Sequence, residues 1–172
     1  MPFRGRFDIL PIMKYYRREA YLRKIRGFYN DTETIKVITG VRRCGKSCLM
    51  ATIAEEILAQ GVDDAHIVYL NLDSRPHKGI KTADALERLV DDRTPAEGRT
   101  YLFIDEVQNV KGFEETLNAY REGGRHSIFI TGSNSYLLSG ELVTKLTGRY
   151  LAFEMFPLTF DEYLGMKKFF GK

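Results

Sequence analysis

The chain has 172 residues, of which 44% are hydrophobic and 28% charged, with a net charge of +3 at neutral pH. That length suffices for one hydrophobic core, and so small a net charge means that the domain as a whole is not strongly basic. The sequence contains no run of the roughly 18 apolar residues that span a membrane, and no signal-peptide pattern at its start. We therefore expect a single soluble, cytoplasmic domain.

The first thirty residues differ in charge from the remainder. They hold eight Lys and Arg against two carboxylates, a net charge of +6. Such a segment is either an arm that binds nucleic acid or an amphipathic helix docked on the core, and the modest overall charge favours the helix. The residues expected to dock are Tyr15, Leu22, Ile25 and Tyr29. We assign residues 1–33 to this segment, whose Tyr and Arg side chains are also suited to flank an adenine ring.

A phosphate-binding loop is predicted next. Thr34 to Thr39 is apolar and β-branched, as in a buried strand, and Lys46 to Gln60 has the apolar spacing of a helix. Between them, G-V-R-R-C-G-K-S fits the pattern G-x-x-x-x-G-K-[ST] without a mismatch. The order of strand, loop and helix is the one in which this pattern binds a nucleoside triphosphate.

The spacing of the loop has a physical basis. Gly40 and Gly45 permit the tight turn that brings successive N–H groups to a phosphate at the start of a helix. Lys46 is expected to reach the β- and γ-phosphates and Ser47 to bind Mg²⁺, so we expect ATP and Mg²⁺ as cofactors. The predicted nucleotide contacts are Gly40, Val41, Arg42, Arg43, Cys44, Gly45, Lys46, Ser47 and Cys48.

Cys44 and Cys48 are the only cysteines, and both lie at this loop. Without neighbouring histidines they cannot form a zinc site, and a disulfide would distort the loop, so reduced thiols are expected. The helix N-terminus and Arg43 are expected to make Cys44 the more reactive of the two.

Two carboxylates follow another apolar segment. After a strand at His66 to Leu72 and a helix at Thr82 to Val90, Tyr101 to Glu106 is typical of a Walker B strand. Asp105 at its end is expected to bind Mg²⁺ together with Ser47. Glu106 is the candidate that orients, or accepts a proton from, the water attacking the γ-phosphate.

Further strands and helices alternate to the end of the chain. A helix near residues 112–121 precedes a strand at Ser127 to Thr131, and a helix at 136–146 precedes a strand at 150–155. Ser133 and Asn134 are either contacts of the γ-phosphate or an ordinary helix cap. The alternation predicts an α/β P-loop NTPase with a mainly parallel five-stranded sheet between helices. The core is expected to span residues 34–160.

The series of motifs resembles the prokaryotic AAA+-like P-loop ATPases of largely uncharacterised role. The resemblance rests on five segments of this sequence. They are the G-x-R-R-x-G-K-S loop, Phe103 to Gln108, Ile130 to Asn134, Leu146 to Arg149, and Pro157 to Tyr163. The resemblance implies that the strand at 127–131 lies between the loop strand and the Walker B strand. It also implies that Arg149 is an arginine finger, which acts within its own subunit or on a neighbour, unless it is simply a surface residue.

The resemblance bears on domain organisation as well. Such proteins continue into a helical lid and a C-terminal domain, so residues 161–172 are expected to begin an extension that is truncated here. We expect ATP hydrolysis coupled to that missing effector domain, with possible homo-oligomers and no membrane partner. Two alternatives are a nucleic-acid-binding module that senses ATP, through its basic N-terminal segment, and a small-molecule P-loop kinase.

Overall fold

The computed structural model describes residues 15–132, 144–146 and 148–171. Its strands are β1 (Ile35–Gly40), β2 (Ile67–Asn71), β3 (Thr100–Asp105), β4 (His126–Thr131) and β5 (Tyr150–Met155). Its α-helices are α1 (Glu19–Ile25), α2 (Lys46–Ala59), α3 (Ala83–Arg93), α4 (Phe113–Glu122) and α7 (Phe160–Phe169). Short 3-10 turns occur at Arg26–Phe28, Asp64–His66 and Val107–Asn109.

The five described strands form one sheet in the order β2-β3-β4-β1-β5, and every pairing in it is parallel. The predicted α/β fold is therefore confirmed, and so is the place of β4 between β1 and β3. Because all the strands run in one direction, their carboxyl ends gather along a single edge of the sheet. The phosphate loop after β1 and the carboxylates after β3 consequently lie at the same edge.

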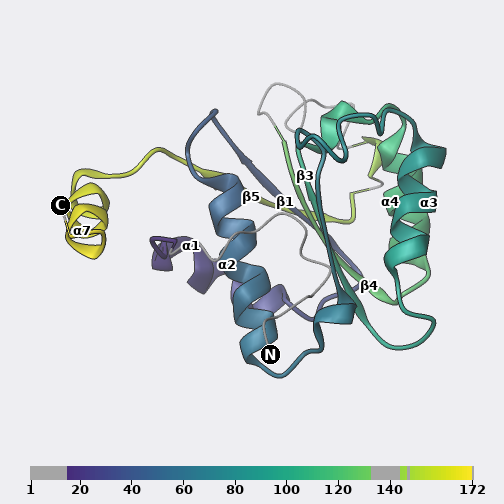
Figure 1. Ribbon diagram of the computed structural model, residues 1–172, viewed down its shortest axis with the longest axis horizontal. Helices are drawn as coiled ribbons and strands as arrows, with labels where there is room; N and C mark the ends of the chain where they lie inside the picture. Colours follow the sequence, from purple (N-terminus) through teal and green to yellow (C-terminus); the bar gives the residue numbers. More distant parts are fainter. Residues whose placement is uncertain (1–14, 133–143, 147, 172) are drawn as a thin grey trace.

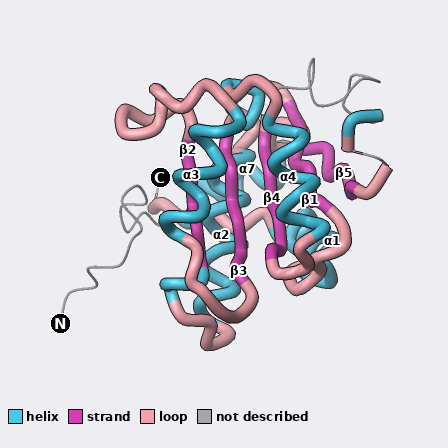
Figure 2. Tube along the Cα trace, turned by 90° about the vertical axis from the view of Figure 1, so that its right-hand side faces the viewer, coloured by secondary structure: helices cyan, strands magenta, loops and turns pink. Residues whose placement is uncertain are grey.

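Helices cover both faces of the sheet, with α1 and α2 on one side and α3 and α4 on the other (Figure 1; Figure 2). Alternate residues of each strand enter the two resulting cores. On β3, Leu102 and Ile104 pack beneath α3 and α4, whereas Tyr101 and Phe103 pack beneath α1 and α2. A strand buried on both faces explains the continuous apolar runs in the sequence.

The boundaries differ from the predicted ones by a few residues. Helix α3 begins after a Thr82 cap and extends to Arg93, three residues beyond the predicted end. Strand β3 ends at Asp105, and Glu106 takes a left-handed backbone conformation with φ of 59°. Most of the helix predicted at 136–146 lies outside the described residues.

The N-terminal segment packs on the core as the amphipathic interpretation predicted. Leu22, Ile25 and Tyr29 are buried in the core beneath α1 and α2. Glu56 of α2 anchors the segment, since it accepts hydrogen bonds from Arg17, from Arg26 at 2.7 and 2.8 Å, and from the Tyr29 hydroxyl at 2.7 Å. The cations of this segment therefore serve, in part, to attach it to α2.

This anchor makes stability depend on pH. The hydrogen bond from Arg26 is the main reason why the pKa of Glu56 is lowered from 4.5 to about 2. A lowered pKa stabilises the folded state above pH 4.5, and that contribution is lost as the pH falls towards 2. In urea titrations, the free energy of unfolding should fall more steeply over this range in the wild type than in Glu56→Gln.

The neighbouring Glu55 supplies the control, because burial raises its pKa. Glu55→Gln should keep the steep acid loss of the wild type. Equal slopes for the wild type and Glu56→Gln would contradict the anchoring role of Glu56.

Candidate functional site

The loop between β1 and α2 requires glycine at two positions. Gly40 has φ of 151°, and a Cβ atom there would lie 2.5 Å from the Met155 carbonyl oxygen. Gly45 has φ of 99° and is the N-cap of α2, where no side chain caps the helix. The N–H groups of the first turn therefore point out of the helix end without a side-chain acceptor, which is the arrangement that binds anions.

Lys46 lies along the loop. Its side chain is buried, and its ammonium group donates to the carbonyl oxygens of Gly40 at 3.0 Å and Val41 at 3.2 Å. The cation is thus held at the mouth of the loop by backbone contacts. A phosphate group there would meet both the ammonium group and the positive end of the helix dipole.

Asp105 is the buried acid of the site, with 1% of its surface exposed. Burial raises the pKa of this carboxyl group, while hydrogen bonds from Ser47 and Thr131 act in the opposite direction. Such a carboxylate favours a cationic partner, and its oxygen atoms together with a hydroxyl group are ligands that suit Mg²⁺. Residues Ser47 and Asp105 therefore fit the expected metal site.

Protein side chains alone do not complete a metal site. Within the described ranges, no group of three or more His, Cys, Asp or Glu is placed to hold an ion. Mg²⁺ commonly binds through one or two protein ligands together with phosphate oxygens and water. The described side chains accordingly fit a Mg²⁺ ion that arrives with a nucleotide.

Glu106 follows Asp105 at the same edge. Its backbone N–H donates to Thr131 Oγ1 at 3.0 Å, and its Oε2 accepts a hydrogen bond from Gln108 Nε2 at 2.6 Å. The left-handed turn and these two contacts direct the carboxylate into the cleft that the loop borders.

Thr131 is a residue that the sequence-based prediction did not include in the site. Its buried hydroxyl donates to Asp105 Oδ1 and accepts from the Glu106 N–H, so it orients both acids. Its position at the carboxyl end of β4, in the strand next to β3, is the signal that identifies it. Gln108 and the exposed Asp73, which also borders the cleft, were not predicted either.

Thr131→Val should lower the free energy of unfolding by about 1–3 kcal/mol, because the buried Asp105 carboxylate and the partly buried Glu106 N–H each lose one hydrogen bond. It should also weaken Mg²⁺-dependent nucleotide binding, which a titration with and without Mg²⁺ measures. Thr100→Val is a matched control, because Thr100 is equally buried at the other end of β3 and its hydroxyl has no hydrogen-bond partner among the described residues. Equal effects of the two substitutions would contradict the orienting role.

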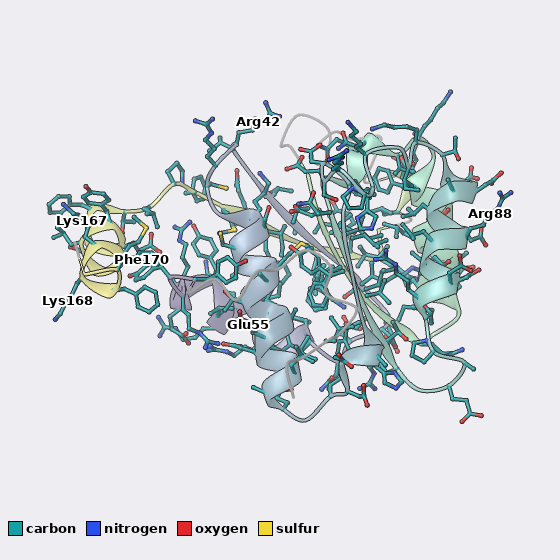
Figure 3. All side chains as sticks on the ribbon, in the orientation of Figure 1. Arg42, Glu55, Arg88, Lys167, Lys168 and Phe170 are labelled. Atoms are coloured by element: carbon teal, nitrogen blue, oxygen red, sulfur yellow. The ribbon has the colours of Figure 1, made fainter. Side chains whose placement is uncertain are left out.

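Described residues border two cavities that adjoin the loop. The first has a volume of about 500 Å³ and is bordered by Arg42, Arg43, Lys46, Ser47, Asp73 and Glu106. The second, of about 270 Å³, lies between the loop, Tyr15, Tyr16 and Arg18 of the N-terminal segment, and Leu158, Met166 and Phe170 near α7. Arg43, which has a left-handed φ of 66°, borders both. Figure 3 shows Arg42 extending outward from the tip of the loop.

Other predicted site residues are not part of this group. Arg149 lies just before β5, where Tyr150 pairs with Ile35, whereas the loop begins at Gly40 beside Met155. Six residue steps of extended strand, about 20 Å, therefore separate Arg149 from the edge that carries the loop. Ser133 and Asn134 lie outside the described residues.

The two thiols, of which Cys44 was predicted to be the more reactive, differ in their access to solvent. Both cysteines are free, but Cys44 is buried with 5% exposure, whereas Cys48 is exposed. Cys48 is therefore the thiol that a reagent in solution reaches first.

Comparison with known proteins agrees with this arrangement. Residues 32–164 match the AAA domain family. The chain is 42% identical over 151 residues to an uncharacterized protein of Haemophilus influenzae, covering 87% of this chain and 38% of that protein. It is 37% identical over 135 residues to an uncharacterized protein of Methanocaldococcus jannaschii, covering 78% of this chain and 29% of that protein. The chain thus spans less than two-fifths of either relative.

Solved structures share the fold at low sequence identity. A DNA polymerase III gamma subunit-related protein of Thermotoga maritima has a TM-score of 0.62 at 10% identity, over 86% of this chain and 49% of that chain. AMPPCP-bound DnaA of Aquifex aeolicus has a TM-score of 0.54 at 18% identity, over 92% of this chain and 51% of that chain. In the part of the chain that the structure describes, no helix has the length and apolar character needed to cross a membrane.

Proposed function

Because the chain belongs to the AAA domain family, we propose that it binds ATP together with Mg²⁺ and hydrolyses it. The observation that supports this proposal most is the convergence of Lys46, Ser47 and Glu106 on one cleft of about 500 Å³, beside the buried Asp105. A cation, a hydroxyl group and two acids at the start of a helix are the groups that phosphoryl transfer requires.

Each of these residues has a proposed role. Lys46 binds the β- and γ-phosphates, while Ser47 and Asp105 hold Mg²⁺, which would neutralise charge on the phosphate oxygens. Glu106, directed by Gln108 and Thr131, orients the attacking water and accepts its proton. Ser133 and Asn134 are proposed as further polar contacts of the γ-phosphate, on the basis of the family resemblance.

The second cavity fits the base of the nucleotide. It adjoins the loop and is lined largely by apolar and aromatic side chains, among them Tyr15 and Phe170. A volume of about 270 Å³ is sufficient for an adenine ring, which such side chains bind through stacking. We propose this cavity as the adenine site.

Arg149 is proposed to act on a neighbouring subunit. Its separation from the loop of its own chain, by the length of β5, argues against a role within the subunit. An arginine that reaches the γ-phosphate of an adjacent subunit accelerates hydrolysis by about 10³ to 10⁵. This role requires a homo-oligomer.

The chain spans less than two-fifths of either relative, so we propose that the domain acts as part of a longer polypeptide. We propose that the nucleotide state of this domain controls a further domain, in a cytoplasmic protein. The exposed Phe156 and the exposed apolar side chains of α7, among them Phe160 and Leu164, are consistent with additional covering structure.

The alternative of a nucleic-acid-binding module has less support. Three cations of the described N-terminal segment, Arg17, Arg18 and Arg26, form ion pairs with carboxylates of the same chain. Charges neutralised in this way contribute little to phosphate binding. A small-molecule kinase would use the same loop but needs an acceptor site, and the two adjacent acids suit activation of water better.

Phosphate release from ATP is the decisive experiment, measured with and without Mg²⁺ and in the presence or absence of DNA or RNA. We expect Mg²⁺-dependent release by the chain alone. Release only with nucleic acid would favour the nucleic-acid-binding alternative, and a protein that binds no ATP would refute the proposal.

A further inference from the structure

The guanidinium group of Arg18 lies buried at the junction of three segments that are far apart in the sequence. Arg18 immediately precedes α1 and is 8% exposed. It contacts the phosphate loop near residue 44 and the connection from β5 to α7 near residues 156–162. A buried cation is costly unless its donors are satisfied, so its contacts are informative.

All five N–H donors of Arg18 have an acceptor. Nε and Nη2 bind the two carboxylate oxygens of Glu162, at 3.0 and 2.7 Å. Nη1 donates to the carbonyl oxygens of Cys44 at 3.0 Å and Phe156 at 2.6 Å, and Nη2 also donates to that of Pro157 at 3.4 Å. The planar guanidinium group of Arg18 thus connects the phosphate loop and the start of α7.

The Cys44 contact bears directly on phosphate binding. In a trans peptide unit, the carbonyl oxygen of one residue and the N–H of the next point in opposite directions. Arg18 binds the Cys44 carbonyl, and the Gly45 N–H of the same peptide unit is therefore directed away from Arg18. Gly45 borders the phosphate cleft, so Arg18 controls the orientation of a donor there.

Helix α7 depends on this junction because it buries none of its own residues. Its first turn is a capping box in which Glu162 and Thr159 bond reciprocally, and the same Glu162 carboxylate binds Arg18. Tyr16 adds a ring contact with Phe169 and lies so close to Gly165 that a Cβ atom there would be 2.6 Å from its hydroxyl oxygen. Among the described contacts of α7, those of Arg18 extend to the phosphate loop.

We propose that Arg18 is a positioning residue that couples nucleotide binding in the phosphate loop to the position of α7 through Glu162. The inference rests on the proposed ATP binding. Coupling between two sites is reciprocal, so weakening the Arg18–Glu162 pair must weaken nucleotide binding, and nucleotide must in turn stabilise α7 against the domain.

Two substitutions and two matched controls test this. Arg18→Lys retains the positive charge but loses the planar guanidinium group that binds both oxygens of Glu162. Glu162→Gln removes the negative charge that pairs with Arg18 but retains the capping box, which accepts Glu or Gln at this position. Arg17→Lys and Glu19→Gln are the controls, since their pairs with Glu56 and Arg26 lie away from the loop. ATP affinity is measured for the 172-residue chain with a fluorescent ATP analogue, and thermal unfolding verifies that each variant is folded.

Arg18→Lys should weaken binding about tenfold or more, and Glu162→Gln should weaken it in the same direction, whereas both controls should bind as the wild type does. The double variant should lose less than the product of the two separate losses, because both remove the same link. Arg18 also borders the cavity proposed for adenine, whereas the residues that line this cavity do not include Glu162. The comparison of Glu162→Gln with the wild type therefore decides the question, also if Arg18→Lys does not fold.

Hydrogen exchange supplies a measurement that a purely structural role would not affect. MgATP should slow amide exchange across residues 160–169 in the wild type and in both controls, but much less in Glu162→Gln. If the wild type binds ATP while α7 exchange stays unchanged and Glu162→Gln binds equally well, the coupling is refuted and ATP binding stands. If the wild type binds no ATP, both proposals fail.

Discussion

Lys46→Ala is expected to abolish measurable ATP binding. The substitution removes the cation that is held at the mouth of the loop, and with it a charge-assisted contact to two phosphates. The glycines that shape the loop and the start of α2 remain. Titration with a fluorescent ATP analogue measures the loss directly.

The control for this prediction is Arg88→Ala, which removes an exposed cation from α3, far from the loop (Figure 3). It should bind ATP with the wild-type affinity. Because Lys46 is itself buried, thermal unfolding must also show that Lys46→Ala remains folded. Unchanged affinity in a folded Lys46→Ala protein would refute the assignment of the phosphate loop.

Glu106→Gln is expected to bind MgATP normally but to hydrolyse it about 10² to 10⁴ times more slowly, the usual magnitude of a general-base effect. The amide oxygen of glutamine can still accept the hydrogen bond from Gln108, so the geometry of the turn should persist. Single-turnover hydrolysis, measured beside equilibrium binding, separates the two steps.

Asp105→Asn provides the contrast, because Asp105 is expected to act through the metal. It should weaken the Mg²⁺ dependence of binding, while Glu115→Gln, at an exposed position on α4, should change neither property. A normal rate for Glu106→Gln combined with a lost rate for Asp105→Asn would mean that the two acids have exchanged roles.

Local sequence patterns were sufficient to predict most of the fold. A strand such as β3, buried on both faces, has an uninterrupted apolar run, and the glycines of the loop mark backbone conformations that other residues adopt only with strain. The phosphate loop and the acids after β3 could be predicted for the same reason. Each lies within a few consecutive residues, so its chemistry does not depend on distant parts of the chain.

Contacts between segments that are distant in the sequence could be identified only from the tertiary structure. Thr131 lies 26 residues after Asp105 and orients it only because β4 is the neighbour of β3 in the sheet. The direction of β5 places Arg149 at the opposite edge from the loop, and packing buries Cys44, the thiol that was predicted to be the more reactive, while it leaves Cys48 exposed.

Arg18 shows most clearly that such long-range contacts cannot be predicted from the sequence. In the sequence it is one of eight cations in a basic segment, and nothing distinguishes it from Arg17 beside it. In the structure it binds Glu162, 144 residues away, together with the backbone of the phosphate loop. The sequence by itself determined the elements and the local chemistry of the loop, because these depend on adjacent residues. Only the tertiary structure decided which cation is buried between loop and helix, because burial depends on how all the segments pack.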